Sequence, residues 1–157
     1  MTVGGGGEGP FELGTDGPTA ILVGVDDTTT SLRAAAYAAG LARRQRAKVT
    51  AVYVAPVASL ATAAPGGADL AAARRQAFSQ IADGMRRRFE EASKELGISI
   101  TFIATEGDPF TEIRRLADET RADAVVVGAS AQAGHRLIGS LAVRLVRAGR
   151  WPVTVVP

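Results

Sequence analysis

Residues 20–27 read AILVGVDD, and this short stretch decides the fold of the chain. Its first six residues are apolar or glycine, without the alternation of polar and apolar residues that marks a half-exposed strand. Such a run is typical of a strand that is buried on both faces of a parallel sheet. The carboxylates of Asp26 and Asp27 end the run. We therefore predict a strand over residues 20–25.

Strands and helices are predicted to alternate along the rest of the chain. Four more apolar segments predict strands over residues 49–54, 98–104, 124–127 and 153–156. Helices are predicted from an N-cap at Thr30 or Ser31, over residues 69–96, from the Asp108-Pro109 pair, and over residues 140–148. This alternation points to an α/β fold, a doubly wound parallel sheet with helices on both faces.

Helical periodicity predicts which side chains the helices bury. In the helix after the first strand, the predicted stripe is Leu32, Ala35, Ala36, Ala39 and Ala42. In the long helix it is Leu70, Ala77, Ile81, Met85, Phe89, Ala92 and Leu96. In the helix after Asp108 it is Phe110, Ile113, Leu116 and Ala117. Gly97 and Gly149 are suited to end two helices, because glycine adopts the left-handed conformation required there.

The composition fits one globular domain that uses neither disulfides nor zinc. The chain has 157 residues, of which 46% are hydrophobic and 22% are charged, close to the globular norm. Cysteine is absent, which excludes a disulfide framework, a thiolate nucleophile and a cysteine-ligated metal. The single histidine, His135, excludes a multi-histidine cluster, although carboxylates can still hold a hard cation such as magnesium.

The N-terminal residues and the charge balance set expectations about location and partners. Glycine-rich residues 1–18 show no apolar period and predict a disordered tail before a domain over residues 19–157. No apolar run approaches the roughly 20 residues that span a bilayer, and the first residues lack the pattern of a signal peptide. We expect a cytoplasmic chain without membrane attachment. The net charge of +2 is too small to indicate nucleic-acid binding.

The loop after the first strand has the composition of a ligand site. In a doubly wound sheet, ligands bind beyond the carboxyl ends of the strands where the strand order reverses, which singles out the loops after the first and fourth strands. The first of these loops holds Asp26, Asp27 and hydroxyl residues at 28–31. These groups can ligate magnesium, bond a ribose or cradle a phosphate. The alternative is structural, with Asp26 ending the strand and the hydroxyls capping the helix.

The loop after the fourth strand, residues 128–140, is rich in small residues. Small side chains let a ligand approach the backbone, and Gly139-Ser140 opens a helix whose N-terminal dipole favours a phosphate. The spacing of a Walker phosphate loop is absent. Arg136 is the arginine of this loop, and its side chain either forms an ion pair with a phosphate or is exposed to solvent. His135 has no nucleophile or orienting carboxylate beside it in sequence, so we predict an exposed loop residue.

Several motifs occur in an order that resembles the universal stress protein family. They are ILVGVD at residues 21–26, GDP at 107–109, VVVG at 125–128, GS at 139–140 and WPVTVV at 151–156. The resemblance extends from about residue 19 to the C-terminus. It implies a five-stranded parallel sheet of strand order 3-2-1-4-5, like that of the adenine nucleotide α-hydrolases. It also implies a cytoplasmic stress-response protein that pairs as a homodimer through its last strand.

Nucleotide-binding members of that family carry the motif G-x-x-G, then nine residues, then G-[S/T]. On this sequence, the resemblance implies that Asp26 faces the adenosine and that Gly128 and Ser130 lie along the ribose and phosphates. Gly139-Ser140 then holds the terminal phosphates. The carboxylates of Asp26 or Asp27 can hold a magnesium ion beside the phosphates, and Asp26 is the residue we predict to ligate it. The full set of residues predicted to contact a nucleotide is Gly24, Asp26, Asp27, Val52, Gly128, Ser130, Ala131, Gly134, Arg136, Gly139, Ser140, Leu141 and Ala142.

The sequence departs from this motif at two points, and the departures leave two functions open. Ala131 replaces the second glycine, and residues 132–138 give a spacing of seven instead of nine before Gly139. The Ala131 methyl group obstructs a phosphate if the position needs positive φ, whereas Gly134 can supply that freedom nearby. The first function is an ATP- or AMP-type nucleotide-binding regulatory protein without turnover chemistry, with ATP and Mg²⁺ as ligands. The second is a nucleotide-free dimer that binds protein partners.

Other families of similar topology fit less well. A response-regulator receiver needs an aspartate at the end of the third strand and a lysine at the end of the fifth, but no lysine follows Lys94. A flavodoxin-like module needs aromatic residues near the strand ends, where there are few. The S-G-G-x-D-S and H-I-G-H signatures of related enzymes are missing after the first strand. Aromatic platforms for nucleic acid are also scarce, because only 5% of the residues are aromatic.

Overall fold

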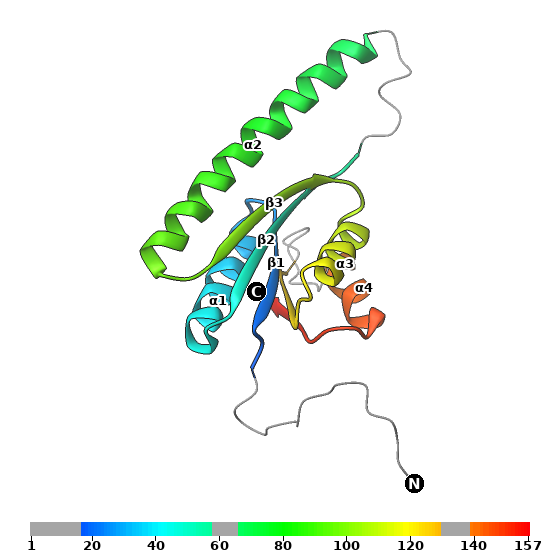
Figure 1. Ribbon diagram of the computed structural model, residues 1–157. Coiled ribbons are helices and arrows are strands. Elements are labelled where there is room, and N and C mark those ends of the chain that lie inside the picture. The colour runs from blue at the N-terminus through cyan, green and yellow to red at the C-terminus, as the bar shows by residue number, and fades with distance from the viewer. Residues whose placement is uncertain (1–16, 58–65, 130–138) are drawn as a thin grey trace.

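A computed structural model describes residues 17–57, 66–129 and 139–157. It confirms the predicted fold, because five parallel strands form one sheet in the order β3-β2-β1-β4-β5 (Figure 1). The strands are β1 (Ala20–Val25), β2 (Lys48–Ala55), β3 (Ile100–Glu106), β4 (Ala124–Gly128) and β5 (Val153–Val156). The helices are α1 (Thr29–Gln45), α2 (Gly67–Leu96), α3 (Pro109–Glu119) and α4 (Ser140–Ala148). Residues 1–16 of the predicted tail lie outside the described residues, so the tail stays a prediction.

Two hydrophobic cores lie on opposite faces of the sheet, because successive strand residues point to opposite sides. On one face, Ile21 and Val23 pack with the alanines of α1 and with Met85 of α2. On the other face, Leu22 and Val125 pack with residues of α3 and α4. Helices α1 and α2 therefore cover one face and α3 and α4 the other (Figure 1). This arrangement is the predicted doubly wound sheet.

The buried side of α1 differs from the predicted stripe. Its buried residues are Ser31, Ala34, Ala38 and Ala42. Leu32 and Ala36, which were predicted to be buried, are both exposed, Leu32 by 36%. The N-cap is also earlier than predicted, because the Thr28 hydroxyl accepts a hydrogen bond from the Ser31 N–H at 3.2 Å. Alanine occurs on most sides of this helix, so hydrophobicity alone does not orient it.

Helix α2 is much longer than the sheet beneath it. Its 30 residues span about 45 Å, whereas the eight residues of β2 span about 26 Å. Its N-terminal part therefore extends beyond the sheet (Figure 1). Two residues of the predicted inward face, Leu70 and Ile81, are accordingly 49% and 45% exposed, and Ala77 between them is exposed as well. At the other end of the helix, Leu96 is 41% exposed in the last turn. In the middle of the helix the prediction holds, since Met85 is buried and Phe89 packs against the same core.

The predicted C-terminal end of α2 and the predicted N-cap of α3 are confirmed, and β3 is shifted by two residues. Asp108 caps α3 by accepting a hydrogen bond from the Thr111 N–H at 2.9 Å. Gly97 ends α2 with φ +62°. The Ile98 N–H then donates to the Ser93 carbonyl, so the chain is still turning at the predicted strand start. Strand β3 accordingly begins at Ile100 instead of residue 98.

Asp123 fastens the start of β1 to the segment that leads into β4. One of its carboxylate oxygens, Oδ2, accepts hydrogen bonds from the Thr19 N–H, the Thr19 hydroxyl and the Ala20 N–H, at 2.8, 2.8 and 2.9 Å. These bonds hold the pKa of Asp123 below its usual value, although partial burial opposes the shift. The start of β1 is thus held by hydrogen bonds to the residue that precedes β4.

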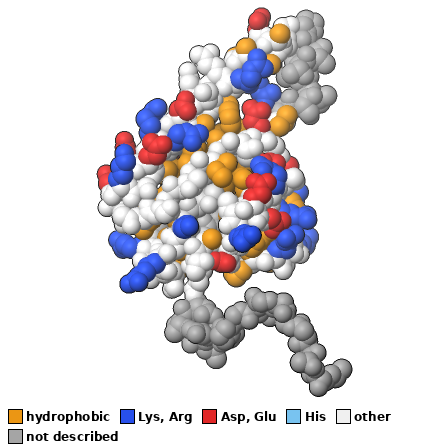
Figure 2. All heavy atoms as spheres, viewed as in Figure 1, with side chains coloured by type: hydrophobic (Ala, Val, Ile, Leu, Met, Phe, Trp, Pro, Cys, Tyr) orange, Lys and Arg blue, Asp and Glu red, His pale blue; other side chains and the backbone are white. Residues whose placement is uncertain are grey.

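The surface seen in Figure 2 carries acidic and basic side chains interspersed, with hydrophobic side chains visible beside α2. This mixture agrees with the net charge of +2. Within residues 17–57, 66–129 and 139–157, none of the helices combines the length and the apolarity that crossing a bilayer requires.

Candidate functional site

A groove lies where the strand order reverses, between the carboxyl ends of β1 and β4. Strand β1 pairs with β2 on one side and with β4 on the other. The connection after β1 therefore runs toward β2, and the connection after β4 runs in the opposite direction, toward β5. The groove has a volume of about 730 Å³, within the range of small-molecule sites in proteins. The end of β2, the start of α3 and the first turn of α4 supply its remaining walls.

Most of the predicted ligand-contacting residues that the structure describes line this groove. They are Gly24, Asp26, Val52, Gly128, Gly139, Ser140, Leu141 and Ala142. Ser130, Ala131, Gly134 and Arg136 lie outside the described residues, as does His135. The two loops singled out in the sequence therefore meet at one site. Their role in contacting a ligand stays a prediction.

Asp27 is separated from this set. Its backbone has φ +64°, a left-handed conformation that aspartate tolerates better than most residues. Its carboxylate forms an ion pair of 2.7 Å with Arg88 of α2. Helix α2 packs on the face of the sheet that α1 covers, away from α3 and α4. The consecutive carboxylates of Asp26 and Asp27 therefore line different cavities. Asp27, which was predicted to contact the ligand, therefore does not line the groove.

A network of short hydrogen bonds fixes Asp26 at the mouth of the groove. Its Oδ1 accepts from the Thr28 hydroxyl at 2.6 Å and from the Thr28 N–H at 3.2 Å. Its own N–H donates to the Ser31 hydroxyl at 3.1 Å, and that hydroxyl donates to the Thr28 carbonyl at 3.0 Å. The hydroxyls thus cap α1, as the structural interpretation required. The same bonds hold the Asp26 carboxylate in the lining of the groove.

Tyr53 is a groove residue that the sequence interpretation missed. It ends up beside Asp26 because Val25 pairs with Tyr53 in the β1–β2 register. Burial, and then the negative charge of Asp26, raise the pKa of the Tyr53 phenol. Its ring also stacks on Phe78 of α2, with centroids 6.0 Å apart. The register between β1 and β2 brings this side chain to the site, and that register cannot be predicted from the residues around Tyr53 alone.

Gly128 has a packing role as well as a place in the groove. A Cβ atom at this position would lie 2.6 Å from the Thr30 carbonyl carbon and 2.7 Å from the Ser31 backbone nitrogen. Real Cβ atoms essentially never approach other atoms so closely. The absence of a side chain therefore lets the first turn of α1 rest directly on the end of β4, which brings the two loops together.

The N-terminus of α4 supplies hydrogen-bond donors to the groove. Gly139 is its N-cap and has no side chain to satisfy the first N–H groups of the helix. Ser140, Leu141 and Ala142 form the first turn and line the groove. The N–H groups of a first helical turn and the positive end of the helix dipole favour an anion at this position.

The charges around the groove are few. Among the lining residues that the structure describes, Asp26 is the one acidic side chain, and lysine, arginine and histidine do not occur. Those residues also hold no cluster of three or more metal-ligating side chains. A magnesium ion at Asp26 would therefore need phosphate oxygens or water to complete its shell, which is a common arrangement for this ion.

Comparison with known proteins identifies relatives over most of the chain. The model of the universal stress protein family matches residues 19–157. Universal stress protein MJ0531 of Methanocaldococcus jannaschii is 30% identical over 139 residues, which cover 87% of this chain and 80% of that protein.

Solved structures give the same result. The universal stress protein UspA of Lactobacillus plantarum is 27% identical and superimposes with a TM-score of 0.73, covering 88% of this chain and 97% of that one. A universal stress protein solved in complex with cAMP is 26% identical, with a TM-score of 0.62 and coverage of 90% and 98%. Together with the strand order and the groove, these matches show that the chain belongs to the universal stress protein family.

Proposed function

We propose that the groove binds an adenine nucleotide and that the protein responds to this ligand without turning it over. The observation that carries the proposal is the meeting of a fixed carboxylate, Asp26, and the uncapped N-terminus of α4 in one groove of about 730 Å³. The carboxylate can accept hydrogen bonds from a base or ribose, and the helix N-terminus can receive phosphate. The cAMP complex of a relative that is 26% identical supports an adenine nucleotide as the ligand.

The charges of the groove favour a nucleotide with few phosphates when magnesium is absent. One phosphate can be held by the N–H groups at the start of α4. The additional negative charges of ATP meet no lysine or arginine among the described lining residues, and they also face Asp26. Mg²⁺ bound to the phosphates and to Asp26 would neutralise these charges. We therefore propose that AMP binds without Mg²⁺ and that ATP requires it.

The same lining supports a function without turnover. General acid–base or nucleophilic catalysis needs a nucleophile beside a base whose pKa suits proton transfer. Among the described groove residues, the hydroxyl of Ser31 is engaged with Thr28 and the Asp26 backbone, and the Asp26 carboxylate is engaged with Thr28. The Thr28 hydroxyl that donates to Asp26 also accepts the Ser31 N–H as the cap of α1, so this hydroxyl–carboxylate pair serves to organise the loop.

Isothermal titration calorimetry with AMP, ATP and ATP plus Mg²⁺ tests the proposal. We expect binding of AMP and of Mg-ATP, weaker binding of ATP alone, and at least tenfold weaker binding of AMP to Asp26→Asn. Asp27→Asn is the matched control, since this adjacent carboxylate lies on the other face of the sheet. Absence of binding heat with all three ligands at millimolar concentration, in folded protein, would refute nucleotide binding.

We also propose that the protein forms a homodimer through β5, in either ligand state. Strand β5 pairs with β4 on one side, and its four residues are only partly buried. The carbonyls of Pro152 and Val156 accept hydrogen bonds from β4 and the residue after it. By the period of two in a strand, the N–H groups of Val153 and Val155 point to the open edge. An open edge of this kind is suited to pairing with a second chain.

Sedimentation analysis of the wild-type protein and of Val155→Pro tests this dimer. Proline removes the outward N–H of Val155 without removing a bond to β4, and edge strands tolerate it. We expect a dimer for the wild type and a folded monomer for the variant. A wild-type monomer at all concentrations, or an unchanged dimer in the variant, would refute pairing through this edge.

A further inference from the structure

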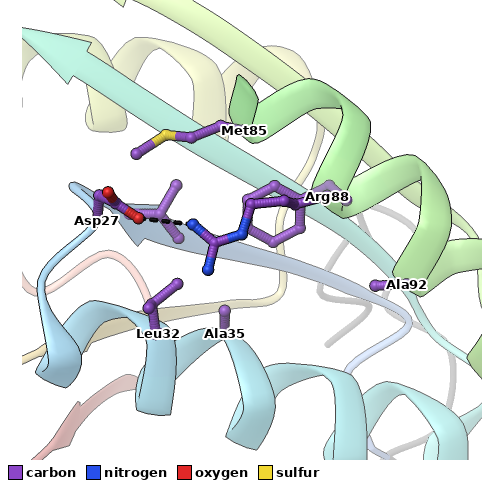
Figure 3. A pocket seen from close by; sticks show the side chains of 8 residues that line it. Asp27, Leu32, Ala35, Met85, Arg88 and Ala92 are labelled. Atoms are coloured by element: carbon purple, nitrogen blue, oxygen red, sulfur yellow. Dashed lines mark hydrogen bonds and ion pairs between the residues drawn. The ribbon is translucent and has the colours of Figure 1, made fainter. Parts of the chain in front are cut away.

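A second cavity lies on the face of the sheet opposite the nucleotide groove. It lies between α1 and α2 beside the end of β1, is partly open to solvent and has a volume of about 170 Å³ (Figure 3). Six of its eight lining residues are apolar: Val25, Leu32, Ala35, Met85, Phe89 and Ala92. The other two are Asp27 and Arg88. Apart from Val25, no lining residue is shared with the groove.

The cavity exists because small residues stand where the two helices approach each other. Ala35 of α1 and Ala92 of α2 face the space from opposite sides (Figure 3). Larger side chains, those of Met85 and Phe89, form a wall but do not fill it. Protein interiors are otherwise packed with few voids larger than a water molecule. An unfilled apolar space of this size is therefore a candidate binding site.

The polar residues of the cavity form an ion pair with each other. The Arg88 guanidinium donates to the Asp27 carboxylate at 2.7 Å, and both side chains are more than half exposed, at 57% and 58%. They therefore lie toward solvent, as does the 36% exposed Leu32, while Val25 and Met85 form the buried inner end of the cavity. The charges of Asp27 and Arg88 neutralise each other, so this ion pair favours neither an anionic nor a cationic ligand. An exposed pair of this kind contributes at most about 1 kcal/mol, and it can open to admit a ligand.

We propose that this cavity binds a small uncharged apolar molecule, about the size of one aromatic ring, behind the Asp27–Arg88 ion pair. Size supports this ligand class, since an engineered apolar cavity of about 150 Å³ in another protein stays dry and binds benzene. Wall chemistry supports it as well. The six apolar side chains offer neither donors nor acceptors, so a polar or charged ligand would lose its hydration without compensation.

Methyl resonances of methionine offer a direct test on the full-length chain. The sequence contains two methionines, Met1 and Met85, and the second lies in the cavity wall. With ¹³C-methyl-labelled methionine, titration with benzene should shift the Met85 signal to saturation through the ring current of the bound molecule, while the Met1 signal stays in place. Benzoate, which has the same ring and one negative charge, should leave the Met85 signal unshifted.

A cavity-filling variant completes the test. Ala35→Leu should weaken benzene binding at least tenfold, and Ala36→Leu, an exposed neighbour on the same helix, should leave it unchanged. If Ala35→Leu does not fold, Ala92→Leu fills the same space from α2. A benzene shift that does not saturate, that benzoate reproduces, or that the filled variant retains would overturn the proposal. None of these outcomes depends on nucleotide binding.

Discussion

Substitution of Gly128 by alanine tests the packing that brings the two loops together. Strand β4 ends at Gly128, and the first turn of α1 lies directly above it. An added Cβ would stand 2.6 Å from the Thr30 carbonyl carbon, 2.7 Å from the Ser31 nitrogen and 2.8 Å from the Thr30 oxygen. All three are backbone atoms, so no side-chain rotation can relieve the overlap. Helix α1 or strand β4 must move.

The size of the effect follows from this geometry. The shortest separation must widen from 2.6 Å to the 3.4 Å of an ordinary contact, at the end of a buried central strand. Overpacking of this kind costs about 1–3 kcal/mol, and a rigid backbone obstacle places Gly128→Ala at the upper end. For a chain of this length, about 3 kcal/mol lowers the melting temperature by about 6–12 °C.

Thermal unfolding followed by circular dichroism measures this loss, with Gly84→Ala as the matched control. Gly84 lies inside α2, and a Cβ there meets nothing within 4 Å. Alanine is the better helix former, so this control should gain about 1 kcal/mol of stability. The same chemical change is therefore predicted to act in opposite directions at the two positions. A melting temperature of Gly128→Ala within 2 °C of the wild type, a shift of about 1 kcal/mol or less, would refute the reasoning.

Three further predictions concern charged side chains. The Arg144 guanidinium, and then the Thr111 N–H and hydroxyl, lower the pKa of Asp108 from 3.8 to about 2. A lowered pKa gives stability that is present above pH 3.8 and lost as pH falls through about 2, and because Asp108 is exposed the effect amounts to about 1 kcal/mol or less. The stability difference between the wild type and Asp108→Asn should accordingly vanish near pH 2, as acid unfolding will measure. Asp123→Ala removes three hydrogen bonds to the start of β1 and should cost about 2 kcal/mol in urea unfolding; an unchanged midpoint would contradict the fastening role. Arg136→Gln should reduce the affinity for ATP severalfold more than that for AMP in calorimetry, and equal losses would argue against a phosphate contact.

The sequence was most informative where one residue type has one structural use. The apolar run at residues 20–25 predicts a central buried strand, and the structure confirms it. Asp108 followed by proline, and Gly97 after the long helix, mark helix ends for reasons of local hydrogen bonding and backbone conformation. The reversal of strand order then directs attention to two loops, and the described parts of both line the groove.

Features that depend on distant contacts could not be predicted in the same way. The buried side of α1 depends on how closely its alanines approach the sheet, and alanine occurs on several sides of the helix. The exposure of Leu70 and Ile81 depends on the length of the sheet relative to α2. The direction of Asp27 depends on a left-handed backbone and on Arg88, which is 61 residues away. Tyr53 reaches the groove through strand register alone.

Because α2 extends beyond the sheet, its two halves should differ in how easily their backbone hydrogen bonds open. Its C-terminal half is held by Met85 and by the stacking of Phe89 on Phe102 at 5.6 Å. Its N-terminal half begins at Gly66 without a side-chain cap, and Leu70 and Ile81 in this half are each a little less than half exposed to solvent. Backbone amides should therefore exchange with solvent progressively more slowly from the first turn to the last. The C-terminal half stays in register with the sheet, whereas unwinding of the N-terminal half would separate Phe78 from Tyr53 and so reach the lining of the groove.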